Sequence, residues 1–243
     1  MVGGASGLGA ATVEWFSAAG WDVAVTDVNE QGATAVAARI QDDGGNATAF
    51  AADVTSPESV DAAVALVART FGRIDAVVAC AGIIAPGAAA TMTDAEWGSL
   101  IDIHLSGTFR CARSSCDALA ASRGAFVGVS SVAGRLGMHQ RASYCAAKAG
   151  IEGLVRSLAV EWAQLGIRVN AVAPGYIETE LVTTALKAGA VTRSELERRT
   201  PLGRLGRPEE AAAAIGFLAS SASSYITGAT LAVDGGFTIH AGF

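Results

Sequence analysis

The chain has 243 residues, of which 51% are hydrophobic and 16% are charged, and its formal net charge is −6. This length and composition fit one large α/β domain with a sizeable buried core. The acidic balance argues against nucleic acid or an anionic membrane surface as a partner.

Short apolar runs alternate along the chain with longer Ala-rich stretches. The runs predict strands at Asp22–Asp27, Ala47–Asp53, Ala76–Ala79, Ala125–Ser130, Ile167–Val172 and Thr230–Val233. They lack polar/apolar alternation, which is typical of parallel strands covered on both faces. The longer stretches predict helices at Leu8–Ala19, Gln31–Asp42, Pro57–Thr70, Asp94–Leu119, Ala142–Leu165 and Pro208–Ala219.

Two of the predicted helices carry clear start signals. Ser56 offers an N-cap before Pro57 at the first helical position. Thr93 and Glu96 form the pattern of a capping box. Repeated strand–helix units predict right-handed crossovers and one parallel, doubly wound sheet, so the fold class is α/β. With no linker in the sequence, we expect residues 1–243 to form a single domain.

The segment Glu180–Gly206 interrupts this rhythm. It is long for a connection, which indicates a functional lid or a substrate loop. Its apolar residues favour a hydrophobic substrate or simple packing, whereas its basic residues keep an acyl-thioester or carboxylate-bearing substrate open. The basic residues are Lys187, Arg193, Arg198 and Arg199.

A glycine-rich turn, Gly3 to Gly9, opens the first predicted helix. Glycines allow the backbone to approach a pyrophosphate, which a helix N-terminus then stabilises. The next predicted strand ends in Asp27, about 20 residues past the glycines. A carboxylate there accepts hydrogen bonds from the adenosine ribose and repels a 2′-phosphate, so NAD(H) is favoured over NADP(H). The alternative interpretation is that Asp27 merely ends a strand.

Tyr144 and Lys148 lie four residues apart near the start of a predicted helix and so share one of its faces. A phenol has a reference pKa of about 10 and is a poor base at neutral pH. A neighbouring cation stabilises the phenolate and brings this pKa toward working pH. Ser131 follows a predicted strand, from which its hydroxyl could hold a substrate oxygen. Alone, such a pair is more often a solvated helix face.

Together these motifs resemble, in order and spacing, the short-chain dehydrogenase/reductase family over essentially the whole chain. The motifs are the glycine turn, Asp27, Asp53-Val54, Ala81-Gly82, Ser131, the Tyr144/Lys148 pair, Pro174-Gly175 and Val233–Gly236. The resemblance implies a Rossmann-type, three-layer α/β/α fold that binds NAD. It also implies an oxidoreductase that interconverts a secondary alcohol and a ketone, commonly as a homotetramer or a homodimer.

The resemblance also implies roles for individual residues. Tyr144 would be the general acid/base, and Ser131, rather than Ser130, would stabilise the substrate oxygen. Lys148 would lower the tyrosine pKa and bind the nicotinamide ribose. The implied cofactor residues are Gly3, Ser6, Gly7, Leu8, Gly9, Asp27, Asp53, Val54, Ala81, Gly82, Tyr144, Lys148, Pro174, Gly175, Ile177 and Thr179. The implied substrate contacts are Ser131, Ala133, Met138, Tyr176 and Leu181.

The sequence departs from the family pattern in two motifs. Ala79 and Cys80 stand where the family has two asparagines, whose amides brace the sheet and the cofactor. His104 stands where the family has a catalytic asparagine that props a water in a proton relay. A neutral imidazole has one donor and one acceptor, so His104 either serves the relay or is a satisfied core residue.

A third departure is that only Met1 and Val2 precede Gly3, where the family has its central first strand. Two residues cannot form a strand of ordinary length. Either the natural polypeptide starts upstream of Met1, or the first strand is truncated. A truncated strand would expose ladder partners on both of its neighbours and weaken the cofactor turn.

The remaining sequence features point to a cytoplasmic protein. The four cysteines (Cys80, Cys111, Cys116 and Cys145) lack metal-ligand spacing and fit a reducing compartment, so we expect no metal. Gly, Pro and Ser residues break the uncharged stretches, and the first residues lack the pattern of a signal peptide. Two alternative functions stay open: a 3-hydroxyacyl-thioester dehydrogenase or 3-oxoacyl reductase, and a catalytically impaired NAD-binding scaffold.

Overall fold

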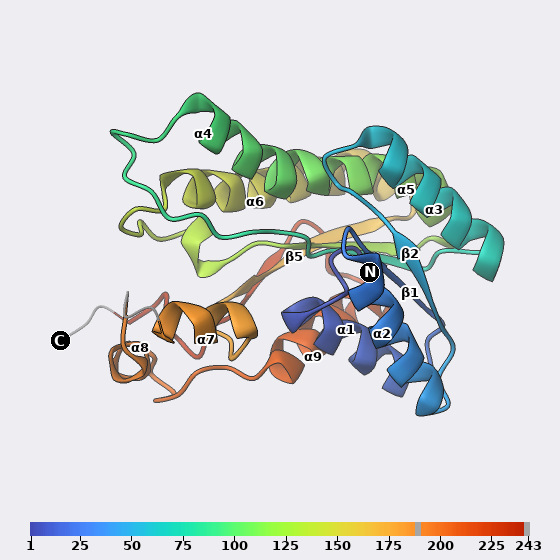
Figure 1. The fold of residues 1–243 in the computed structure, drawn as a ribbon. Helices are drawn as coiled ribbons and strands as arrows, with labels where there is room; N and C mark the ends of the chain where they lie inside the picture. The colour runs from blue at the N-terminus through green and yellow to red at the C-terminus, as the bar shows by residue number, and fades with distance from the viewer. Residues whose placement is uncertain (188–190, 241–243) are drawn as a thin grey trace.

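A central parallel sheet organises the computed structural model, which describes residues 1–187 and 191–240 (Figure 1). β1 (Val23–Asp27) pairs with β2 (Ala47–Ala51). The other ladder has the order β3 (Ala76–Ala79), β4 (Ala125–Val129), β5 (Arg168–Pro174) and β6 (Thr230–Val233). All of these pairings are parallel, which confirms the predicted doubly wound α/β class.

Within residues 1–187 and 191–240, the start of the chain joins the two ladders. Val2 forms isolated parallel bridges with Thr26 of β1 and with Ala79 of β3. Met1 and Val2 therefore lie at the centre of the sheet, between β1 and β3.

Helices cover both faces of the sheet (Figure 1). Their bounds are α1 (Gly7–Ala18), α2 (Glu30–Asp42), α3 (Pro57–Phe71), α4 (Asp94–Ile101), α5 (Gly107–Ser122), α6 (Ala142–Trp162), α7 (Glu180–Lys187), α8 (Arg193–Arg199) and α9 (Pro208–Ala219). Short 3₁₀ turns lie at Val132–Gly134, Ala163–Leu165 and Ser221–Ser223. α1, α2 and α9 lie on one face, and α3, α4, α5 and α6 lie on the other.

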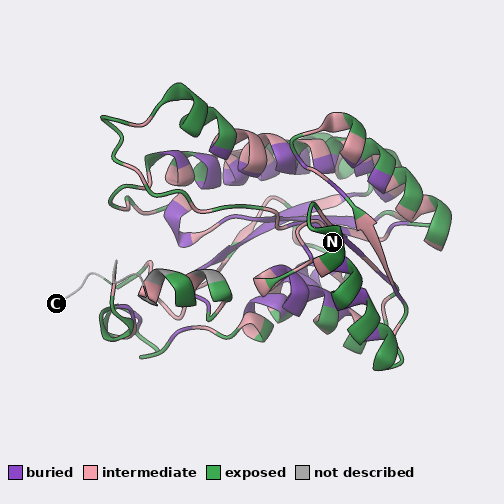
Figure 2. Cartoon of the chain, viewed as in Figure 1, coloured by how far each residue is buried: buried purple, intermediate pink, exposed green. Residues whose placement is uncertain are grey.

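The core forms two apolar layers, one on each face of the sheet, which appear as buried residues in Figure 2. Val78 and Val127 point into the layer under α1 and α9, whereas their neighbours Val77 and Phe126 point into the layer under α5 and α6. Successive strand residues face opposite sides, so both sides must be apolar. This explains why the strands read as continuous apolar runs.

Local capping matches the sequence. The Ser56 side chain accepts a hydrogen bond from the Ser59 amide ahead of α3, and Thr93 and Glu96 form the capping box of α4. Two elements differ from expectation. The helix predicted over Asp94–Leu119 is interrupted by a π-helical turn at Asp102–Ser106. The segment predicted as a loop over Glu180–Gly206 contains α7 and α8.

Candidate active site

The glycine turn lies against the backbone that follows β3. Gly3 has a φ of 82°, and a Cβ there would stand 2.5 Å from the Ala81 nitrogen. A Cβ on Gly9 would collide with the Gly3 carbonyl. Only glycine fits either position, so the turn stays narrow and α1 begins at Gly7 with its N-terminus facing the turn. The N–H groups of such a helix start form a cradle for a pyrophosphate.

Asp27 ends β1 beside this turn. Its Oδ2 accepts a hydrogen bond from the Ala5 amide (3.0 Å), and its Oδ1 accepts one from the Asn29 amide (2.9 Å). The carboxylate therefore braces the glycine turn, a role that the sequence did not reveal. It also leaves a negative charge beside the cradle, where an adenosine ribose would lie. The narrow turn and this carboxylate together fit a nicotinamide dinucleotide.

The chain after β5 completes the cradle from the other side. Thr179 Cβ lies 3.7 Å from where a Cβ on Gly7 would stand. The Thr179 amide donates to the Ile177 carbonyl (2.7 Å), and Ile177 bridges to Gly206. A Cβ on Gly175 would lie 2.9 Å from Asp234 Cα, so a side chain there would push β5 away from the turn after β6.

Asp53 and Val54, which the resemblance implies as cofactor residues, have other partners as well. Asp53 Oδ1 accepts hydrogen bonds from the Thr55 amide (2.8 Å) and hydroxyl (2.7 Å), which hold the pKa of Asp53 below its usual value. The Val54 side chain is buried in the core, and its carbonyl accepts a hydrogen bond from Arg110. Cofactor contact through Val54 would therefore involve its backbone.

Tyr144 and Lys148 lie together on α6 over the end of β4. The Lys148 side chain is buried, and its Nζ donates to the Val129 carbonyl (2.8 Å). The same Nζ lies 5.5 Å from the centre of the Tyr144 ring. Ser131 is separated from the end of β4 by one residue, and its hydroxyl accepts a hydrogen bond from the Ala133 amide (3.1 Å).

Burial sets the protonation of this pair. It raises the pKa of Tyr144, and the neighbouring Ser131 hydroxyl opposes that rise. Burial also lowers the pKa of Lys148 to about 8. Without a further positive charge nearby, the phenol therefore keeps its proton at neutral pH. A cationic group bound beside it would favour the phenolate.

Ser130 points away from Tyr144 and supports the lysine. Its buried hydroxyl lies 3.0 Å from the Lys148 carbonyl and 3.2 Å from Glu152 Oε1, and it donates toward both. Glu152 in turn forms a salt bridge with Arg135 (3.2 Å). Sequence reasoning missed Glu152 and Arg135, although Glu152 lies four residues after Lys148 and so shares its helix face.

His104 lies in the π-helical turn, buried, with its ring edge-on to Tyr144 at a centroid distance of 5.3 Å. Its Nε2 lies 2.7 Å from the Ile83 carbonyl oxygen and 3.1 Å from the Ile83 amide nitrogen. Burial, helped by the Lys148 charge, lowers the His104 pKa to about 3, so the ring is neutral. Nδ1 is buried and has no partner among the described residues. A neutral ring with one free nitrogen beside Tyr144 suits a water-mediated relay.

Replacing His104 with Ala is therefore expected to lower kcat on the order of tenfold and to shift the pH–rate profile. The reason is that the water of the proton relay would lose the side chain that holds it. His104→Asn should restore most of the rate, since an amide can also hold a water. Steady-state rates from pH 6 to 10 test this, with thermal melting to verify folding. An unchanged profile in His104→Ala would leave His104 as a core residue.

The predicted substrate residues differ in exposure. Ala133 is buried, Met138 is half-buried, and Tyr176 packs on Phe237 with ring centroids 5.2 Å apart. Leu181 falls in α7, but its side chain lies outside the described residues. Sequence reasoning also missed Arg141. Its Nη1 is buried with no partner among the described residues, and its charge makes a smaller contribution that lowers the Tyr144 pKa.

In residues 1–187 and 191–240, no group of three or more His, Cys, Asp or Glu side chains is placed to hold a metal ion. No helix within those ranges combines the length and the apolar character needed to cross a membrane.

Comparison with known proteins places the chain among oxidoreductases. A family model described as enoyl-(acyl carrier protein) reductase matches residues 3–238. The cis-4-hydroxycyclohexanecarboxylate dehydrogenase of Sinomonas cyclohexanicum is 47% identical over 242 residues, covering 98% of this chain and 95% of the relative. The D-threitol dehydrogenase of Mycolicibacterium smegmatis is 41% identical and covers 98% of this chain and 92% of the relative.

A solved structure shows the same architecture. The crystal structure of a short-chain type dehydrogenase/reductase from Mycobacterium marinum superposes with a TM-score of 0.92 at 34% sequence identity. The match covers 98% of this chain and 94% of that one.

Proposed function

The chain belongs to the short-chain dehydrogenase/reductase family and is an oxidoreductase that interconverts secondary alcohols and ketones, and from this premise we propose that it uses NAD(H) with Tyr144 as general acid/base. The observation that carries the proposal is the gathering of Ser131, Tyr144 and Lys148 at the end of β4. We further propose that residues 1–243 act as one domain.

The cofactor would lie across the ends of the strands. The proposed pyrophosphate site is the turn from Gly3 to Gly9, and the adenosine side is Asp27, Asp53, Val54, Ala81 and Gly82. The nicotinamide side is Pro174, Gly175, Ile177 and Thr179, together with Tyr144 and Lys148. When bound, the oxidised nicotinamide supplies a hydride acceptor and a positive charge.

The residues of this chain would then handle the proton. Ser131 holds the substrate hydroxyl beside Tyr144 by a hydrogen bond. The Tyr144 phenolate takes the hydroxyl proton while the carbinol C–H bond breaks and its hydride leaves, so that a ketone remains. In the reverse direction, the Tyr144 phenol returns that proton to the carbonyl oxygen. The buried Lys148 cation favours the phenolate, and His104 would pass the proton on through water.

The preference for NAD(H) rests on Asp27. Replacing Asp27 with Ala is expected to raise KM for NAD about tenfold. The ratio of kcat/KM with NAD to kcat/KM with NADP should fall by at least the same factor. The carboxylate both binds ribose hydroxyls and repels a 2′-phosphate, and each charge-assisted hydrogen bond contributes about 1.5–3 kcal/mol. Initial rates with both cofactors measure the ratio.

Asp22→Ala is a matched control, because Asp22 is an exposed carboxylate directly before the other end of β1. An unchanged ratio in Asp27→Ala would contradict the NAD assignment.

The substrate we propose is a secondary alcohol with an apolar body and a carboxylate. Three observations support it: the unpaired Arg141 nitrogen near Tyr144, the apolar Tyr176–Phe237 pair, and the name of the relative from Sinomonas cyclohexanicum. The second candidate is a 3-hydroxyacyl thioester or its 3-oxo form, which the name of a relative from Escherichia coli, a 3-oxoacyl-[acyl-carrier-protein] reductase 38% identical to this chain, favours.

A screen of alcohols with NAD tests the function. Hydroxycyclohexanecarboxylates, neutral cyclohexanols, linear polyols and a 3-hydroxyacyl thioester are compared by NADH formation. We expect the highest kcat/KM for a hydroxycyclohexanecarboxylate, and higher activity on the thioester would favour the second candidate. Tight NAD binding without turnover of any alcohol would instead indicate the binding scaffold.

We also propose how the chain assembles and where in the cell it is located. We propose a homotetramer or a homodimer, because family members commonly assemble in this way. Cys80, Cys111, Cys116 and Cys145 all carry free thiols, which fits a reducing cytoplasm.

A further inference from the structure

Two buried side-chain nitrogens in the described part of the chain lack a hydrogen-bond partner, and both belong to neighbours of Tyr144. One is His104 Nδ1 and the other is Arg141 Nη1. His104 packs edge-on against the Tyr144 ring, whereas Arg141 lies at the start of α6, three residues before Tyr144. Orphaned buried polar atoms are rare in native proteins, so each calls for an explanation. The proton relay accounts for His104, whereas proton transfer gives Arg141 no role.

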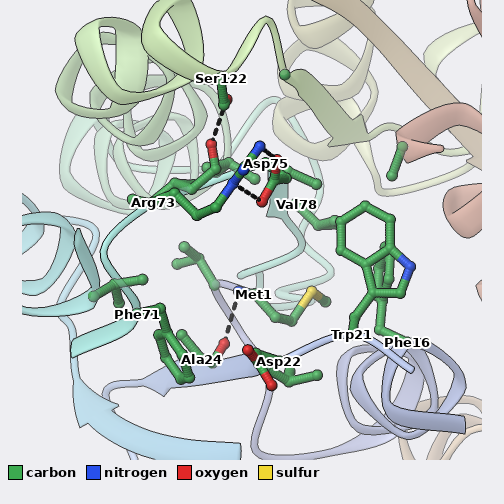
Figure 3. Close-up of a pocket in the computed structure, with 18 of the residues that line it drawn as sticks. Met1, Phe16, Trp21, Asp22, Ala24, Phe71, Arg73, Asp75, Val78 and Ser122 are labelled. Carbon is green, nitrogen blue, oxygen red and sulfur yellow. Dashed lines mark hydrogen bonds and ion pairs between the residues drawn. The ribbon is translucent and has the colours of Figure 1, made fainter. Parts of the chain in front are cut away.

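Arg141 also lacks a neutralising carboxylate. No Asp or Glu within residues 1–187 and 191–240 forms an ion pair with it. Arg73 shows the usual arrangement: it lines the cavity of about 1070 Å³ between β1 and β3 and donates two hydrogen bonds to Asp75, of 2.8 and 2.5 Å (Figure 3). Arg110 is likewise paired with Asp102. A half-buried cation without an anion is unfavourable, so Arg141 is in place for an anion that the described chain does not supply.

The position of Arg141 in α6 is a poor one for a cation. Arg141 is the N-cap residue of this 21-residue helix, its side chain makes no capping hydrogen bond, and the first turn contains no acidic residue. The macrodipole gives a helix N-terminus a partial positive charge, which favours anions and disfavours cations. Ser, Thr, Asp and Asn are the residues that stabilise an N-cap. Local helix stability therefore does not explain an arginine here, and such exceptions are expected at functional sites.

The loop after β3 connects the surroundings of His104 with those of Arg141. At one end, the Ile83 carbonyl oxygen lies 2.7 Å from His104 Nε2. At the other end, the Gly87 amide donates to the carbonyl of Gln140 (3.1 Å), the residue directly before Arg141. The residues between these two contacts are apolar, and Ile83 is 42% exposed. This loop therefore offers apolar surface to a molecule that reaches both ends of the site.

Positive charge gathers around Tyr144. The Lys148 ammonium lies 5.5 Å from the centre of its ring, and the Arg141 charge is close enough to lower the pKa of the phenol. His104 is neutral, because burial lowers its pKa to about 3. Such a site attracts an anionic substrate. A guanidinium matches a carboxylate in particular, because its planar fork forms two parallel N–H···O hydrogen bonds with the two oxygens.

We propose that Arg141 is a specificity-determining residue, which binds a carboxylate of the substrate while Ser131 and Tyr144 hold the reacting hydroxyl. This inference rests on the proposed function, because it assigns a binding partner to the carboxylate of the substrate class named there. The apolar body of the substrate lies between the two polar ends, along the loop after β3. A neutral alcohol leaves the buried Arg141 nitrogen without a partner, and so does an acyl thioester, whose carboxylate is masked. The site therefore discriminates against both.

Two substrates that differ in charge alone test this role: a hydroxycyclohexanecarboxylate and the matching hydroxycyclohexanecarboxamide, each oxidised with NAD. In Arg141→Met, we expect kcat/KM for the carboxylate to fall about 30-fold, mainly through KM, and kcat/KM for the carboxamide to stay within about threefold. Arg141→Lys keeps the charge but not the fork, so its loss should lie between these values.

Arg156→Met is the control, because Arg156 is an exposed cation on the same helix and should leave both substrates unaffected. Equal losses for both substrates in Arg141→Met, together with a shifted pH–rate profile, would assign Arg141 to the Tyr144 pKa and overturn the substrate role. Unchanged selectivity between the two substrates would overturn it as well. Thermal melting verifies that each variant is folded.

Equilibrium binding separates this inference from the proposed function. Cyclohexanecarboxylate has no hydroxyl to oxidise, so its calorimetric titration into the chain, with and without NADH, needs no turnover. We expect its Kd to rise at least about tenfold in Arg141→Met, whereas the Kd of cyclohexanecarboxamide should stay the same. A chain that binds cyclohexanecarboxylate through Arg141 but oxidises no alcohol would contradict the proposed function alone. A chain that oxidises alcohols but binds cyclohexanecarboxylate equally well with Met at position 141 would overturn the role of Arg141 alone.

Discussion

Tyr144→Phe is expected to lower kcat by two to four orders of magnitude while leaving NAD binding within about twofold of the parent. The Tyr144 phenol lies near Ser131 and Lys148, where it can exchange a proton with the substrate oxygen, and general acid–base catalysis contributes about 10²–10⁴-fold. The substitution removes one hydroxyl and keeps the ring against His104, so the fold should be undisturbed. Steady-state alcohol oxidation and a fluorescence titration with NADH measure the two effects.

Tyr225→Phe is the matched control. The Tyr225 side chain is fully exposed, so the same chemical change there should leave kcat unchanged. Normal turnover in Tyr144→Phe would remove Tyr144 from the reaction. Parallel losses of turnover, NADH binding and Tm would show that the phenol serves the structure instead.

Lys148→Met is expected to reduce kcat/KM by about 10²-fold and to move the ascending limb of the pH profile to higher pH. The buried ammonium lies near the Tyr144 ring and is held by the Val129 carbonyl. Without that cation, the phenolate is less stable and the Tyr144 pKa rises, so alcohol oxidation needs a more alkaline solution. In the parent chain the Lys148 pKa is about 8, so its support for the phenolate fades above that pH.

The pH profile of kcat/KM from 6 to 10 tests this prediction. Arg156→Met is the control, because Arg156 is an exposed cation on the same helix and its loss changes the net charge equally. Burial lowers the Lys148 pKa, so the buried charge reduces the free energy of unfolding below pH 8. In that pH range, the Tm of Lys148→Met should therefore be no lower than that of the parent chain. A reduced Tm in Lys148→Met, or an unshifted profile, would contradict the assigned role.

The predicted helices and strands agree closely with the structure because their signals are local. β3 and β6 begin and end at the predicted residues, and α9 does so after the Pro208 start signal. Periodicity and capping depend on neighbours within a few residues, so the sequence carries them directly. The π-helical turn is different. It ends at Gly107, where a Cβ would stand 2.9 Å from Val54 Cβ, and periodicity does not report such contacts between distant segments.

The sequence by itself determined the family, the alternating architecture and the candidate set of Ser131, Tyr144 and Lys148, because these follow from residue types at fixed spacings. Only the tertiary structure decided how distant segments meet. It turned Ser130 toward Glu152 and Asp27 toward the glycine turn, and it left the Arg141 and His104 nitrogens without partners among the described residues. Such contacts arise because parallel strands far apart in sequence become neighbours only when the sheet is assembled.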